Sequence, residues 1–251
     1  MRLAAALATA FAILTVAVAA HALRPVDRFA LDHLMPFRSD NVAGTIAPAE
    51  PERAIRPILD GERSFAQSAA ALLFAPADSL SAIVLAAGAA VVLRRRGRPW
   101  RVAGVWIGAV VAGVAIEGSG KLIVPQIPFG PPSTILNVTI EGTYPSGHTI
   151  RSVLLAAMVA ALWPRWWALA AVWVVYVTSV LELGGLHVPT DIAGGFLAGG
   201  ALAAAAVALQ SSGHAALQAP GSPHLHPTAG APGGRARRPG ADRREEQPEA
   251  G

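Results

Sequence analysis

The stretch YPSGHTIR, residues 144–151, opens an apolar run that is long enough to form a membrane helix. Its proline suits the first helical turn, where the missing N–H costs no hydrogen bond. Ser146 and Gly147 leave backbone N–H groups at the positive end of that helix, where an anion is stabilised. His148 lies in the same first turn, and Arg151 follows on the same face. The stretch therefore predicts an apolar helix whose first turn binds an anion.

A second stretch, HVPTD at residues 187–191, stands at the start of another apolar run. His187 and Asp191 are four residues apart, so a helix brings the carboxylate within reach of the imidazole. A carboxylate that holds one ring nitrogen fixes the tautomer, and the other nitrogen can then attack phosphorus. A second imidazole, that of His148, can protonate the departing alkoxide and later activate water. Two histidines beside an anion-binding site indicate phosphoryl transfer.

The same pair of motifs also occurs in metal sites, but the chain supplies no convincing third ligand. We therefore predict no metal and no cofactor. Cysteine is absent, which excludes disulfides and thiolate metal sites.

The composition is that of an integral membrane protein. Of the 251 residues, 53% are hydrophobic and only 14% are charged, whereas a soluble domain averages about 25% charged residues. The formal net charge of +4 comes mainly from a few arginine clusters, and arginines beside membrane spans usually set topology. No basic groove with interleaved aromatic residues is visible, so nucleic acid is not an expected partner.

Apolar segments of helical length predict an all-α, polytopic bundle of six transmembrane helices. The predicted spans are residues 3–23, 73–93, 102–120, 146–163, 168–183 and 191–209. The first span, within residues 1–23, also fits a signal peptide, although an uncleaved span is favoured.

Three further regions follow from this pattern. Residues 24–72 are predicted to be an outer loop with short interfacial helices, and residues 73–210 the transmembrane core. Residues 211–251 have almost no large apolar residues and are predicted to be a disordered cytoplasmic tail.

The basic loop RRRGRPWR, residues 94–101, fixes the predicted orientation, because short loops rich in arginine stay in the cytoplasm. Counting spans from this loop places Lys121, the turn before His148, and His187 together on the opposite, extracytoplasmic face. Glu117 lies four residues before Lys121, the favourable order for a helical ion pair. Their convergence on one face is the main argument that these residues form one site in the cell membrane.

These motifs resemble the type 2 phosphatidic acid phosphatase (PAP2) superfamily over about residues 100–205. The resemblance implies that Lys121 contacts the substrate phosphate and that Ser146 and Gly147 line its binding site. It further implies that His148 is the general acid, His187 the nucleophile that forms a phosphohistidine, and Asp191 the carboxylate that orients it. The implied activity is metal-independent hydrolysis of a lipid phosphate or pyrophosphate at the outer membrane face.

The chain departs from the family pattern at two arginines. Pro128 and Phe129 stand where the first motif has Arg-Pro, and Val180 and Leu181 stand where the third motif has Ser-Arg. Arg151 is the candidate to replace them as a phosphate-binding residue. Alternatively, Arg151 is the partner of a lipid headgroup or of an ion pair. An alternative function therefore stays open, that of a PAP2-fold membrane protein that has lost turnover and binds a lipid headgroup or a partner.

Overall fold

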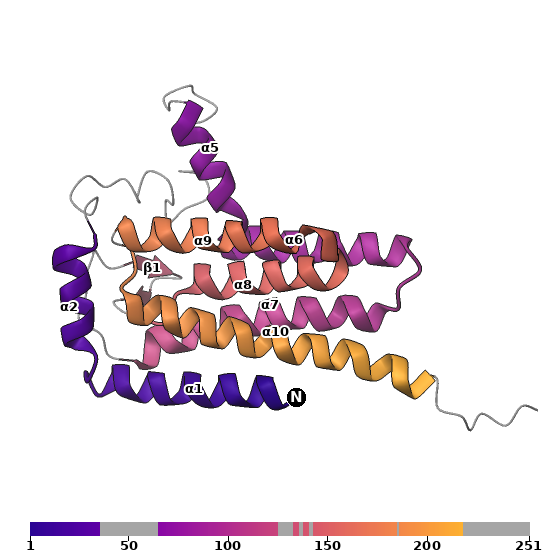
Figure 1. The fold of residues 1–251 in the computed structure, drawn as a ribbon, viewed down its shortest axis with the longest axis horizontal. Helices are drawn as coiled ribbons and strands as arrows, with labels where there is room; N and C mark the ends of the chain where they lie inside the picture. The colour runs from indigo at the N-terminus through magenta and orange to yellow at the C-terminus, as the bar shows by residue number, and fades with distance from the viewer. Residues whose placement is uncertain (36–64, 125–132, 136–137, 141–142, 185, 218–251) are drawn as a thin grey trace, which may run out of the picture.

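The computed structural model describes residues 1–35, 65–124, 133–135, 138–140, 143–184 and 186–217. Most of the long helices run along one axis and form a bundle (Figure 1). In chain order the elements are α1 (Arg2–Ala19), α2 (Arg24–His33), α5 (Phe65–Phe74), the 3-10 helix η1 (Ala75–Ala77), α6 (Ser79–Arg95), α7 (Trp100–Ile123), β1 (Ser133–Ile135), β2 (Val138–Ile140), α8 (Gly147–Leu162), the 3-10 helix η2 (Pro164–Trp166), α9 (Trp167–Leu183) and α10 (Pro189–Leu217).

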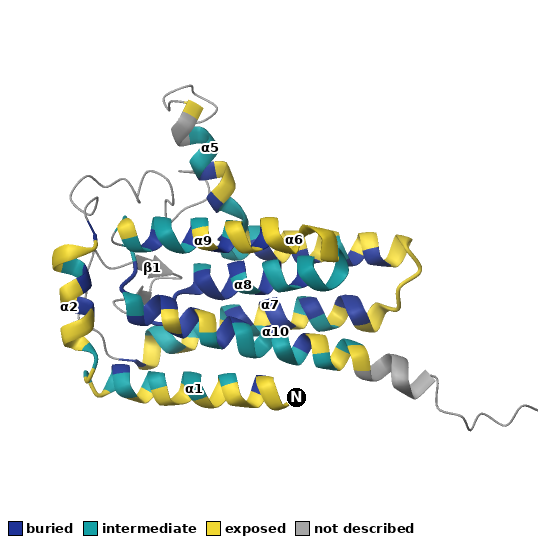
Figure 2. Ribbon diagram, viewed as in Figure 1, coloured by how far each residue is buried: buried dark blue, intermediate teal, exposed yellow. Residues whose placement is uncertain are grey.

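The central helix of the bundle is α8, which packs against α7, α9 and α10. Figure 2 shows buried residues concentrated along it. Ile150 and Leu154 of α8 are fully buried and belong to the same core cluster as Trp106 of α7 and Ala198 of α10. α10 approaches closely because its glycines lack a side chain: a Cβ at Gly199 would lie 2.9 Å from the carbonyl oxygen of Ile150. The helix that carries the predicted anion site is thus held on three sides.

The outer faces of the bundle are apolar. Large side chains such as Val16 of α1, Leu80 of α6 and Val172 of α9 are at least 60% exposed, and soluble monomers rarely expose apolar surface on this scale. Within the described residues, four helices are long and apolar enough to cross a membrane, and the bent pair of α5 and α6 brings that number to five. The chain is a multi-pass membrane protein.

The predicted count of six spans is not confirmed. α8 has only 16 residues, whereas a span needs about 20. The predicted span over residues 73–93 is wrong in its first part, because the helices at Ser68–Ala77 and Ser79–Arg95 meet at 70°. Pro76 lacks an N–H and restricts the residue before it, and Asp78 at the bend has an extended backbone.

Three other boundaries differ from the predicted ones. α1 ends at Ala19, before a turn in which His21 has a φ of 61°. α10 continues to Leu217, beyond the predicted start of the tail at residue 211. The Pro- and Gly-rich segment before α8 contains a short antiparallel ribbon, in which Ser133 pairs with Ile140. The predicted outer loop contains α2, while residues 36–64 of that loop and residues 218–251 of the tail lie outside the described residues.

The basic loop and the candidate site lie at opposite ends of the bundle (Figure 1). The guanidinium of Arg96 lies 5.8 Å from the ring centre of Trp163, at the end of α8. Arg101 donates a hydrogen bond of 3.3 Å to the carbonyl oxygen of Leu209, near the end of α10. The first turns of α8 and α10, which carry the predicted histidines, are therefore at the far end from residues 94–101.

Candidate functional site

The first turn of α8 is capped by Ser146. Its hydroxyl oxygen accepts hydrogen bonds from the Thr149 hydroxyl at 3.0 Å and from the Thr149 backbone N–H at 3.4 Å, as expected of an N-cap serine. The backbone N–H of Ser146 donates to the carbonyl oxygen of Asp191 at 3.0 Å, which ties α8 to α10. Within the described residues, the backbone N–H groups of Gly147 and His148 have no hydrogen-bond acceptor. These two N–H groups are the donors that the sequence predicted for an anion.

His187 and Asp191 form the predicted pair. Nδ1 of His187 lies 3.2 Å from Oδ2 of Asp191, and the two side chains are 8% and 0% exposed. The same carboxylate oxygen accepts a hydrogen bond from the backbone N–H of Val188 at 3.4 Å, so its orientation is fixed. This contact leaves Nε2 of His187 as the nitrogen that faces the site.

His148 has a carboxylate partner that the sequence analysis did not identify. Nε2 of His148 lies 3.1 Å from Oδ1 of Asp78, which stands at the bend between η1 and α6. The signal in the sequence is an aspartate immediately before an apolar run and two residues after Pro76, the usual position of a helix cap. The predicted straight span hid this signal, because it placed Asp78 inside a helix.

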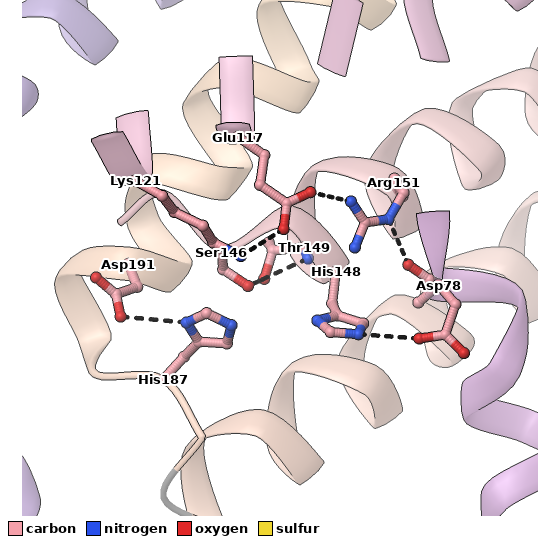
Figure 3. A network of polar contacts seen from close by, with 10 residues as sticks. Asp78, Glu117, Lys121, Ser146, His148, Thr149, Arg151, His187 and Asp191 are labelled. Carbon is pink, nitrogen blue, oxygen red and sulfur yellow. Dashed lines mark hydrogen bonds and ion pairs between the residues drawn. The ribbon is translucent and has the colours of Figure 1, made fainter. Parts of the chain in front are cut away.

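The two imidazoles face each other. Their ring centres are 6.3 Å apart, and the rings are inclined at 62°. Figure 3 shows the nitrogens that have no carboxylate, Nε2 of His187 and Nδ1 of His148, pointing toward one another across the space between the rings. Phe74 also packs against His148, with ring centres 5.1 Å apart. Two carboxylate-backed imidazoles that face one space can act on opposite sides of a single phosphorus atom.

Three charged side chains lie beside the histidines (Figure 3). Nζ of Lys121 lies 2.6 Å from Oε1 of Glu117, as predicted from their spacing. Arg151 is 2% exposed; its Nη1 contacts Oε2 of Glu117, and its Nε donates to the carbonyl oxygen of Ala77 at 2.6 Å. Arg151 therefore faces neither lipid nor solvent, and both predicted phosphate-binding cations meet on one carboxylate.

The chain is similar to known proteins in sequence and in fold. The family model of the PAP2 superfamily matches residues 118–214, which include Lys121, the first turn of α8, and the His187–Asp191 pair. The predicted resemblance to the PAP2 superfamily is confirmed. A crystal structure described as the first transmembrane PAP2 type phosphatidylglycerolphosphate phosphatase from Bacillus subtilis is similar in fold, with a TM-score of 0.51 and 17% identity. The structural match covers 84% of this chain and 98% of that chain. In a separate comparison, no curated protein matches significantly.

One of the two positions where the sequence is expected to lack an arginine of the PAP2 pattern lies within the described residues. That position is Leu181, which is fully buried in an apolar cluster with Phe74, Val177 and Ile192. Residues 128 and 129 lie outside the described residues.

The start of α10 is held by a second buried carboxylate. Asp27 of α2 accepts hydrogen bonds from the Thr190 hydroxyl at 2.8 Å and from the Thr190 backbone N–H at 3.3 Å. Burial raises the pKa of the Asp27 carboxyl above its usual 3.8, the negative charge of Asp191 adds to the rise, and the two hydrogen bonds from Thr190 oppose it. Asp27 thus connects the interfacial helix to the residue next to Asp191, a contact between residues 163 positions apart.

Among the described residues, no three His, Asp or Glu side chains lie together in a way that would hold a metal ion.

Proposed function

We propose that this protein is a membrane phosphatase that hydrolyses a lipid phosphate or diphosphate through a phosphohistidine intermediate. The observation that carries the proposal is the pair of facing imidazoles, each backed by a carboxylate: His187 by Asp191 and His148 by Asp78. The PAP2 match over residues 118–214 supports the same reaction class.

In the proposed first step, Nε2 of His187 attacks phosphorus and forms an N–P bond. The P–O bond to the lipid breaks, and protonated His148 gives its Nδ1 proton to the departing oxygen. Asp191 holds His187 in the tautomer that leaves Nε2 unprotonated and stabilises the cation that forms. The free N–H groups at the start of α8 bind the equatorial phosphate oxygens.

In the second step, neutral His148 accepts a proton from a water molecule, which attacks phosphorus from the side that the lipid has left. The N–P bond breaks, inorganic phosphate leaves, and His187 is restored. His148 and Asp78 have side chains that are 25% and 23% exposed, whereas His187 and Asp191 are almost fully buried. Water and the leaving group therefore approach from the His148 side, as the mechanism requires.

An apolar groove along the bundle supports a lipid substrate. It has a volume of about 820 Å³ and lies between α6, α8 and α9. Leu73 and Pro76 line its end nearest the site, and Gly88 and Trp163 line it farther along the bundle. Pro76 is next to Ala77, whose carbonyl binds Arg151. We infer that a hydrocarbon chain in this groove would pass Pro76 and have its headgroup at the end of the bundle that carries Asp78 and His148.

The proposed location follows from the ends of the bundle. The site lies at the end opposite to the basic loop of residues 94–101, and such loops stay in the cytoplasm. We infer an extracytoplasmic active site in the cell membrane. The proposed topology has six spans, with α8 as a short span that needs less length because other helices enclose it.

The test is release of inorganic phosphate by the purified protein in detergent, from a panel of lipid phosphates and diphosphates, with chelator present. His187→Ala is the matched control. Release by the wild-type protein, loss in the variant, and trapping of an acid-labile, base-stable phosphoprotein support the proposal. Equal release by the wild-type and the variant would falsify it, and no release from any substrate favours the alternative of a PAP2-fold protein that only binds a headgroup.

A further inference from the structure

The carboxylate of Glu117 lies against the first residue of α8. A Cβ built on Gly147 would overlap the carboxyl carbon and both carboxyl oxygens of Glu117. Glycine is therefore needed at position 147 for this carboxylate to reach its place. The start of α8 also favours an anion through the positive end of the helix. Among the residues that the structure describes, the backbone N–H groups of Gly147 and His148 have no acceptor there.

The same carboxylate takes both cations of the site. Oε1 accepts from Lys121 at 2.6 Å, and Oε2 binds Arg151. Arg151 cannot turn away easily, because its Nε is bound to the carbonyl oxygen of Ala77 and its side chain is 2% exposed. A carboxylate between a lysine, a guanidinium and a helix start has the partners that a phosphate group would have.

We propose that Glu117 is an internal ligand of the phosphate-binding site, and that a phosphate binds there only by displacing the Glu117 carboxylate. This proposal takes the location of the phosphate-binding site from the proposed function. It does not depend on turnover, because it concerns the binding of an anion.

This arrangement makes Glu117 a residue that determines specificity. A carboxylate carries one negative charge, so an anion of the same charge gains little electrostatic energy by replacing it between Lys121 and Arg151. A terminal phosphate or diphosphate carries more charge and gains more. The site therefore favours lipids that end in a phosphomonoester or a diphosphate over phosphodiesters, whose phosphate carries a single charge.

Glu117→Gln is the direct test, since glutamine keeps the size of the side chain and removes its charge. Binding of inorganic orthophosphate to the full-length protein in detergent is measured by isothermal titration and by the shift of the thermal unfolding midpoint. We expect at least a tenfold lower Kd in the variant and a larger midpoint shift at equal phosphate. Glu182→Gln is the matched control. It removes one carboxylate at the same end of the bundle, from the end of α9, and should leave the Kd unchanged.

Glu117→Asp is the second variant, in case the glutamine variant does not fold. It keeps the charge near Lys121 but shortens the side chain by one methylene, which withdraws the carboxylate from Gly147, and a lower Kd than wild-type is again expected. An unchanged Kd in the folded variants, or an equal fall in Glu182→Gln, overturns the proposal. Lipid turnover is assayed on the same preparations. Tighter orthophosphate binding without turnover in any protein refutes the phosphatase and keeps this inference, whereas wild-type turnover with an unchanged Kd refutes this inference alone.

Discussion

Oδ1 of Asp78 lies 3.1 Å from Nε2 of His148, across 70 positions of sequence. The contact exists because the chain bends at η1, which brings the residue before α6 over the first turn of α8. A carboxylate in contact with the far nitrogen stabilises the protonated imidazole, the form that donates a proton to a leaving group. Asp78 is therefore a positioning residue for the proposed general acid.

The first prediction concerns Asp78→Asn and the leaving group. A general acid is worth about 10²–10⁴-fold when the leaving group is a poor one, so we expect the variant to lose up to about 10²-fold in kcat for an alkyl lipid phosphate. An aryl phosphate with an acidic phenol needs little protonation and should lose much less. The measurement is the ratio of kcat for the two substrates.

Asp191→Asn is the matched control for this experiment, because Asp191 acts on the proposed nucleophile and not on the leaving group. It should lower kcat for both substrates by a similar factor. An equal loss for both substrates in Asp78→Asn would show that Asp78 has only a structural role.

The sequence could predict those contacts of the site that lie within one helical turn. The His187–Asp191 and Glu117–Lys121 pairs both span four residues, and both are present. The cap formed by Ser146 also follows from a local pattern. Contacts of this kind depend only on helix geometry, which a sequence displays directly.

Contacts between distant segments could not be predicted in this way. The partner of His148 depends on a bend near Pro76, and hydrophobicity alone does not distinguish a bent pair from a straight span. The partner of Arg151 is Glu117, 34 positions earlier in the sequence. The two side chains meet because α7 and α8 pack side by side. The count of six spans is not confirmed, because α8 has only 16 residues and is enclosed by other helices. The usual length of about 20 residues is that of a helix in contact with lipid.

The second prediction concerns the packing of α10 on the start of α8. A Cβ at Gly195 would lie 2.6 Å from Cβ of Thr149 and 2.8 Å from the carbonyl oxygen of Ser146. Gly195→Ala must therefore push α10 away from the site, at a cost of about 1–3 kcal/mol in the free energy of unfolding. We expect a lower thermal midpoint and reduced turnover, because His187 and Asp191 move with α10.

Gly104→Ala is the control for Gly195→Ala. Gly104 lies within α7, and a Cβ there meets no atom within 4 Å. Alanine should raise helix stability by up to about 1 kcal/mol at such a position and leave turnover unchanged. If both variants behave alike, close packing at Gly195 does not position the site.

The third prediction concerns Asp27 and pH. Since burial raises the pKa of Asp27, the native protein binds this proton more tightly than the unfolded chain does. The stabilisation from protonation is fully present below the unfolded value of 3.8 and is lost as the pH rises through the native pKa. Asp27→Asn cannot titrate but keeps an oxygen that accepts from Thr190. The thermal midpoint of the wild-type minus that of the variant should therefore fall as the pH rises from about 4 to about 7.

A difference that is constant over this range would show that Asp27 has no raised pKa in the native protein. Asp32→Asn serves as the reference, because Asp32 is an exposed residue of the same helix. Its difference from wild-type should not change with pH in the same direction.

The last prediction concerns the apolar groove and the length of the substrate's hydrocarbon chain. Gly88 of α6 lines the groove, and a Cβ there meets no atom within 4 Å, so a side chain can begin there without a clash. With a rise of 1.5 Å per residue, Gly88 lies about 14 Å along α6 from Ser79, beyond the reach of a short chain. Gly88→Trp should raise KM for a long-chain lipid phosphate by about tenfold or more and leave a short-chain analogue unaffected. Gly104→Trp, on α7 and outside the groove, should change neither. The same KM for the long-chain lipid in wild-type and Gly88→Trp would mean that the chain lies elsewhere.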